Sequence, residues 1–121
     1  MSKAAAHKSF DRLVRLATAL DLPDVEVGTT HGAPALRVRD RPFVSIKGDD
    51  LMVLHCPLEM TEMLMEMAPE IYFQTKHFKG WPGLLVRLDV IGDEELSLRI
   101  EDAWRFRAPE KLAATRPTLG S

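Results

Sequence analysis

The chain has 121 residues, of which 45% are hydrophobic and 28% are charged, and its formal net charge is −2. This length is typical of one domain, and the composition is that of a globular protein rather than of a disordered chain. Dedicated nucleic-acid binders usually carry a strongly basic balance, so a nucleic-acid contact here would require a local basic patch.

The first predicted element is a helix over residues 9–21. Ser9 is a suitable N-cap, and Pro23 stops the helix just beyond its end. The two ends of the chain are small and polar, so we expect residues 1–8 and 114–121 to be flexible and residues 9–113 to form a single domain. The apolar stripe of the helix follows the helical period and comprises Phe10, Leu13, Val14, Ala17 and Leu20.

Short strands follow, separated by turns that contain glycine, proline and aspartate. The alternation of polar and apolar residues between these turns predicts an antiparallel meander. Its strands are expected at about residues 25–28, at 35–39, at 44–47 and at 51–55.

A methionine-rich helix is predicted after the meander, between Pro57 and Pro69, which are typical boundary residues. The helical period places one group of methionines on the side that faces the sheet and leaves Met65 exposed. The methionines expected to face the sheet are Met60, Met63 and Met67.

Two strands and a helix complete the chain. The strands are predicted at residues 71–74 and 84–90. Asp93 is a suitable N-cap for the last helix, and the two glutamates that follow it favour the positive end of the helix dipole. The order of helix, meander, helix, two strands and helix predicts an α+β fold of two layers, a mainly antiparallel sheet with helices packed on one face.

The sequence gives little support for catalysis or for a metal centre. The four histidines and Cys56 show no zinc spacing, and no phosphate loop or nucleophile motif occurs. We therefore expect no catalytic residue, no metal and no cofactor, and we expect Cys56 to be a partly buried, inert thiol. No apolar run approaches the ~18 residues of a membrane span, so we expect a cytoplasmic protein without membrane contact. We also expect a monomer or a weak dimer.

Basic residues gather in two segments. The first segment, on or beside one hairpin, carries Arg37, Arg39, Arg41 and Lys47. Arg37 and Arg39 are expected on one face of a strand, because strand side chains alternate. If the two segments lie at one edge of the sheet, they form a positive patch with stacking groups, which is typical of nucleic-acid binding. The alternative is a solvated strand face and a turn whose aromatic residue packs into the core. The second segment carries Lys76, His77, Lys79 and Arg87, interleaved with Phe78 and Trp81.

Three stretches resemble the MmcQ/YjbR family, and the likeness runs from about Phe10 to Ala113. The stretches are DVEVGTTHGAPALRVRDRPFVSI, PEIYFQTKHFKGWPGLLVRL and EDAWRFRAPEKLA. The most specific parts are Thr75, His77, Gly80 and Pro82 before the strand, and Ala103-Trp104-Arg105 near the end. Family members often carry an aromatic residue after this proline. This chain has Gly83 there, and Trp81 can supply the ring instead.

The resemblance implies a CyaY-like domain, in agreement with the element order. Members of the family are often described as DNA-binding through a double-wing surface, so the resemblance makes DNA the first candidate partner. The candidate DNA- or ligand-binding residues are Arg37, Arg39, Lys76, His77, Lys79, Trp81, Arg87 and His31.

A second interpretation makes the protein a small-molecule- or protein-interaction module. The loops at residues 28–34 and 75–82 carry histidine, threonine and tryptophan at high density, and a cleft between them would be the site. In both interpretations the protein is a binding domain and not an enzyme, because no nucleophile–base pair occurs at a recognisable spacing.

Overall fold

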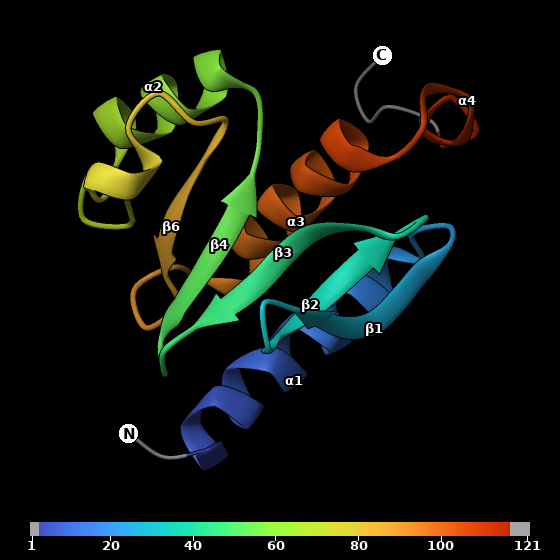
Figure 1. Ribbon diagram of the computed structural model, residues 1–121, viewed down its shortest axis with the longest axis horizontal. Coiled ribbons are helices and arrows are strands. Elements are labelled where there is room, and N and C mark those ends of the chain that lie inside the picture. The colour runs from blue at the N-terminus through green and yellow to red at the C-terminus, as the bar shows by residue number, and fades with distance from the viewer. Residues whose placement is uncertain (1–2, 117–121) are drawn as a thin grey trace.

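The computed structural model describes residues 3–116 (Figure 1). In chain order, its helices and strands are α1 (Lys3–Leu20), β1 (Val25–Thr30), β2 (Ala33–Val38), β3 (Arg41–Lys47), β4 (Leu51–His55), α2 (Leu58–Met67), β5 (Tyr72–Phe73), the short 3₁₀ helix η1 (Lys76–Phe78), β6 (Gly83–Arg87), α3 (Asp93–Arg107) and α4 (Glu110–Ala113).

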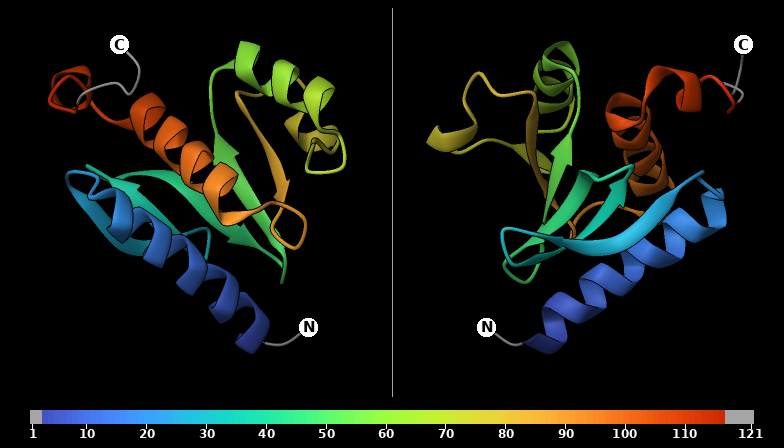
Figure 2. Two further views of the ribbon diagram at one scale, coloured as in Figure 1. Left: turned by 180° about the vertical axis from the view of Figure 1, so that it is seen from behind. Right: turned by 45° about the vertical axis from the view of Figure 1, so that its right-hand side comes forward.

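The strands form one sheet in the order β1-β2-β3-β4-β6-β5, in which every neighbouring pair is antiparallel. Helices α1 and α3 contact each other and pack on the central strands (Figures 1 and 2). Helix α2 packs against β5 and β6. The predicted α+β fold with an antiparallel sheet is therefore confirmed.

Two tight turns hold the first three strands in register. His31 and Gly32 join β1 to β2, and both have positive φ angles, 50° and 80°. Arg39 and Asp40 join β2 to β3 with φ angles of 48° and 68°. Two consecutive residues with positive φ twist a two-residue turn in the same sense as the strands that it connects.

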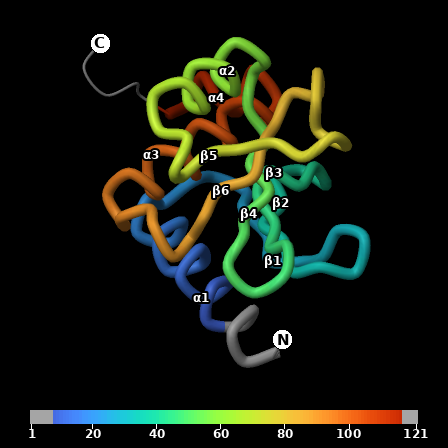
Figure 3. Tube along the Cα trace, turned by 90° about the vertical axis from the view of Figure 1, so that its left-hand side faces the viewer, coloured from blue at the N-terminus to red at the C-terminus, as the bar shows by residue number. Residues whose placement is uncertain are grey.

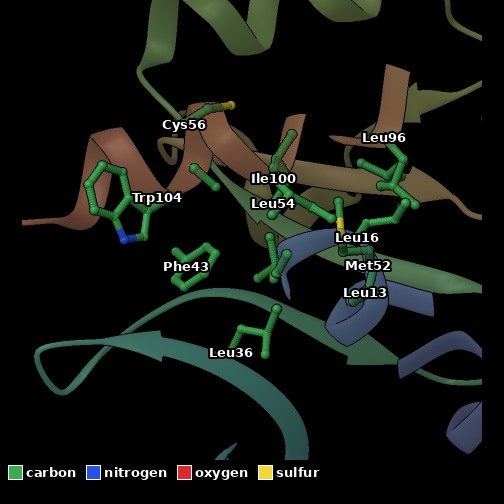
Figure 4. Close-up of a cluster of buried hydrophobic side chains, with 14 of the residues drawn as sticks. Leu13, Leu16, Leu36, Phe43, Met52, Leu54, Cys56, Leu96, Ile100 and Trp104 are labelled. Atoms are coloured by element: carbon green, nitrogen blue, oxygen red, sulfur yellow. The ribbon is translucent and has the colours of Figure 1, made fainter. Parts of the chain in front are cut away.

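The hydrophobic core lies between the sheet and the helices α1 and α3 (Figure 4). Trp104 of α3 is fully buried, and its indole N–H donates to the Pro23 carbonyl at 2.9 Å, so the one polar atom of this side chain is satisfied. Alternate residues of β4 face this core, and the others face away from it. The core side chains include Leu13 and Leu16 of α1, Leu36, Phe43, Met52 and Leu54 of the sheet, and Leu96, Ile100 and Trp104 of α3.

Arg12 joins α1 to the connection between β6 and α3. Its Nη1 and Nη2 donate to the carbonyls of Leu88 and Ile91, each at 2.6 Å, and its Nε donates to Asp93 at 2.7 Å. Residues 88–90 form a turn, and the strand predicted to reach residue 90 ends at Arg87. Asp93 is not an N-cap as predicted. Gly92 occupies that position without a side-chain bond, and the Asp93 carboxylate is paired with arginines instead.

Helix α1 is longer than predicted, and the described C-terminal end contacts α3. Helix α1 begins at Lys3, so residues 3–8 are helical, and Ser9 is not an N-cap but an interior residue. The Ser9 hydroxyl donates to the Asp49 carbonyl at 2.7 Å. At the other end, Arg116 pairs with Glu101 at 3.1 Å. The rest of the terminal predictions, residues 1–2 and 117–121, falls outside the described residues.

The orientation predicted for α2 is wrong for three of its methionines. Met63 and Met67 are 47% and 70% exposed, whereas Met65, expected at the surface, is partly buried against the core. Thr61 and Leu64 are the buried residues of this helix. Leucine and methionine occur on most sides of the helix, so its apolar period does not single out one face.

Candidate ligand-binding cleft

A cleft of about 510 Å³ lies where the β1–β2 turn and the segment around η1 approach each other. Figure 3 shows both segments projecting to the same side of the sheet. Met52 and Leu54 of β4 face the core, so Val53 and His55, which line the cleft, point to the other face. The other lining residues are Thr30, His31, Ala33, Pro42, Ser45, Ile46, Lys47, Phe78, Trp81 and Arg107.

Trp81 lies on one side of the cleft, and its position depends on Gly83. A Cβ atom at Gly83 would lie 2.0 Å from the indole ring and 2.8 Å from the Leu54 carbonyl oxygen. The indole meets the rings of His55 and Phe78 edge-to-face, with centroids 4.9 and 5.1 Å away. Because Gly83 has no side chain, the Trp81 ring can occupy this space.

The cleft is cationic at neutral pH. Lys47 and Arg107 line it, and none of the described residues that line it is acidic. Burial, together with the nearby Arg107 charge, lowers the pKa of His55 to about 4, so this imidazole is neutral and accepts or donates hydrogen bonds without a charge. Burial and the neighbouring Arg41 charge also lower the pKa of Arg107, which nevertheless stays protonated because guanidinium groups are such weak acids.

Arg107 reaches the cleft from the C-terminal end of α3. Its Nε donates to the Pro42 carbonyl at the start of β3, at 3.1 Å. This bond holds the guanidinium group at the start of β3, where it lines the cleft together with His55. Lys47 lies at the opposite end of β3.

Of the residues predicted as binding residues, His31 and Trp81 line the cleft. Lys76 and Lys79 instead line a separate groove of about 390 Å³, together with Met65 and Gln74. His77 is exposed on η1 and lines neither of these two cavities.

The predicted basic residues of the sheet are engaged locally. Arg87 stacks on the Phe73 ring, with its guanidinium carbon 4.0 Å from the ring centroid. Arg37 donates to the Asp40 carbonyl at 2.9 Å. The prediction that Arg37 and Arg39 share a strand face is wrong, because β2 ends at Val38 and Arg39 lies in the turn, where it pairs with Asp24 at 2.5 Å.

Among the charged and imidazole residues of the cleft, three were not predicted as binding residues: Lys47, which the sequence placed only in the first basic segment, His55 and Arg107. The period-two alternation of the strands was a usable signal for the first two, because it places both on the side of the sheet that faces away from the core. Arg107 gave no such signal, since it is 52 positions from His55 in the printed sequence and meets the cleft only through the packing of α3.

Cys56 follows His55 but faces the core. It is completely buried, and burial raises the pKa of its thiol to about 12. Within residues 3–116, no three histidine, cysteine or acidic side chains are grouped as they would be around a metal ion. None of the described helices has the length and apolar character needed to cross a membrane.

Comparison with known proteins gives one family and a small set of relatives. A model of the YjbR family matches residues 20–106, which include every cleft residue named above except Arg107, the next residue along the chain. An uncharacterized protein of Mycobacterium bovis and two of Mycobacterium tuberculosis are each 46% identical over 49 residues. This match covers 40% of the chain and only 38% of each relative. No solved structure matches the chain significantly.

Proposed function

The chain belongs to the YjbR family, and we propose that it is a non-enzymatic binding domain that holds a small molecule in the cleft between the β1–β2 turn and the η1 segment. The observation that carries this proposal is the cleft itself. Its volume of about 510 Å³ falls within the range of small-molecule sites, roughly 300–1,000 Å³.

The lining has the composition expected of a ligand site. Phe78 and Trp81 offer apolar ring surface, while Ser45, His31 and His55 offer hydrogen-bonding groups. The site is also supported by rigid elements, because β3 and β4 are central strands of the sheet and carry several of the lining residues.

A thermal-shift screen of metabolites tests the proposal, because a ligand that binds only the folded state raises the unfolding temperature. Thr30→Trp would fill the mouth of the cleft with a bulky side chain. Thr29→Trp is the matched control: Thr29 is the adjacent residue, is exposed, and does not line the cleft. A compound that stabilises the natural chain and the control, but not Thr30→Trp, supports the proposal. Equal stabilisation of all three chains, or no stabilising compound in a broad library, contradicts it.

Single-stranded nucleic acid is a second candidate ligand. The observation that favours it is the exposure of Lys76, His77 and Lys79 on the η1 segment, beside the aromatic pair Phe78 and Trp81. Stacked bases and nearby cations are the usual means of single-strand binding.

Fluorescence anisotropy with a labelled oligonucleotide at two salt concentrations tests this candidate. Phosphate contacts by Lys76 and Lys79 would make the affinity fall steeply with salt, and the double change to glutamine would reduce that slope. Absence of binding even at low salt would exclude nucleic acid as the ligand.

A further inference from the structure

Arg107 is a part-buried cation without an ion pair among the described residues. Six other arginines in this part of the chain are paired with carboxylates: Arg12, Arg15, Arg39, Arg99, Arg105 and Arg116. Arg37, Arg41 and Arg87 also form no ion pair among the described residues, but they do not line the cleft. Burial and the charge of Arg41, which has the same sign, both lower the pKa of Arg107. A bound anion would stabilise a partly buried charge that lies near a like charge.

The guanidinium group of Arg107 is also held in position. Its Nε donates a hydrogen bond to the Pro42 carbonyl, whereas Nη1 and Nη2 form no hydrogen bond among the described residues. These two nitrogens form the flat fork that binds carboxylate or phosphate with two parallel hydrogen bonds. Because the Nε bond already fixes the side chain, little conformational entropy remains to be lost when an anion binds.

The surroundings of this fork select against other kinds of ligand. A cationic ligand would meet the charges of Arg107 and Lys47, and none of the lining residues described carries a carboxylate. His55 lines the same cleft as Arg107, and its ring meets the Trp81 ring edge-to-face with centroids 4.9 Å apart. An anion on Arg107 therefore shares the cleft with the aromatic surface of Trp81, on which a flat ring can pack.

From these contacts we propose that the cleft binds a small organic anion with a planar ring, whose carboxylate or phosphate pairs with Arg107 while its ring packs against Trp81. This inference rests on the proposed function and adds to it the chemical class of the ligand. Arg107 is then the residue that selects for charge, and Trp81 the residue that selects for a ring.

Calorimetric titration with two matched pairs of probes tests the inference. The first pair is 1-naphthoate and 1-naphthamide, and the second is adenosine monophosphate and adenosine; within each pair only the anionic group differs. We expect an anionic probe to bind about tenfold or more tightly than its neutral partner, which is the usual size of a charge-assisted bidentate interaction. The pair that shows the difference identifies the anion as a carboxylate or a phosphate.

Two variants assign the effect to Arg107. Arg107→Gln should weaken binding of the anionic probe about tenfold and leave that of its neutral partner within about twofold. Arg39→Gln is the control, because Arg39 is outside the cleft and paired with Asp24, and it should bind both probes as the natural chain does. Circular dichroism of each variant shows whether it is folded, and Arg107→Lys, which keeps the charge but not the fork, provides a second measurement if Arg107→Gln unfolds.

The possible outcomes are distinct. Equal binding of anionic and neutral probes overturns the inference but leaves the cleft as a small-molecule site. The inference also fails if the metabolite screen yields a cleft ligand while all four probes fail to bind. Binding of a single-stranded oligonucleotide alone would replace the inference with nucleic-acid recognition. No binding in the screen or in the titrations overturns both the inference and the proposed function.

Discussion

Substitution of Gly83 by alanine should destabilise the protein and displace Trp81 from the cleft. Gly83 does not have a positive φ angle, so its backbone conformation is open to any residue. Alanine in a strand would then ordinarily stabilise relative to glycine, by about 0.5–1 kcal/mol. Here the added methyl group would lie 2.0 Å and 2.5 Å from two carbons of the indole. Contacts this short require the ring to move.

The cost can be divided between two neighbours of the new methyl group. Overpacking typically destabilises by about 1–3 kcal/mol, and one part arises from the Trp81 ring. The other part arises from the Leu54 carbonyl oxygen at 2.8 Å, which belongs to the neighbouring strand β4. In a Trp81→Ala background the ring part is absent. Gly83→Ala should therefore cost about 1–2 kcal/mol less in that background than in the natural chain.

A double-mutant cycle by urea unfolding measures this coupling energy. The unfolding transition is followed by circular dichroism, because Trp81→Ala removes one of the two tryptophans and changes the fluorescence signal. Loss of affinity for a cleft ligand in Gly83→Ala would be an independent sign that the ring has moved. Additive effects, with a coupling energy below about 0.3 kcal/mol, would refute the reasoning that Gly83 is there to make room for Trp81.

Three further outcomes follow from the ion pairs and the buried histidine. Arg12→Lys should lower the free energy of unfolding by about 2 kcal/mol, because one ammonium group cannot bond to two carbonyls and a carboxylate that lie in three directions. Urea titration measures the loss, and an unchanged unfolding midpoint would contradict the prediction. Between pH 6.5 and about 4, His55 binds a proton in the unfolded chain but not in the folded chain, so the free energy of unfolding should fall by about 2 kcal/mol as pH is lowered through this window. The loss should be smaller in His55→Gln. If His55 titrates near pH 6.5 by NMR in the folded protein, this prediction is contradicted. Hydrogen bonds from Arg116 and Arg105 lower the pKa of Glu101, so its stabilising effect should persist down to pH 4.5 and disappear as pH falls through the lowered value. Comparison with Glu101→Gln at pH 7 and pH 3 tests this, and an identical acid loss in both chains would contradict it.

Local sequence patterns predict the sheet well because each strand is bounded by its own turns. Strand β4 has the bounds that its alternation predicts, residues 51–55, and the tight turns before it need only local backbone geometry. Helix α1 begins before the residue that its apolar stripe predicts, because the alanine-rich segment before Ser9 adds no residues to the stripe but has a high helix propensity.

The candidate site was only partly predictable for a different reason. His31 and Trp81 stand out in turns of unusual composition, and the idea of a cleft between their loops came from that density. The basic residues are a poor guide to the site because the sequence does not show which of them are paired with carboxylates. The Asp24 carboxylate that pairs with Arg39, for example, is 15 positions away. Arg107 contributes through the docking of a helix onto the sheet, which no local pattern describes.

The contact between α1 and α3 has a consequence for how the chain folds during synthesis. Arg12 and Trp104 each form hydrogen bonds across about 80 positions, to Asp93 and to Pro23 respectively. The core between these helices cannot form until α3 has left the ribosome. Until then the apolar face of the meander is exposed. We infer that the domain acquires its fold late and as one unit, and that chains shortened before α3 are the ones most exposed to aggregation.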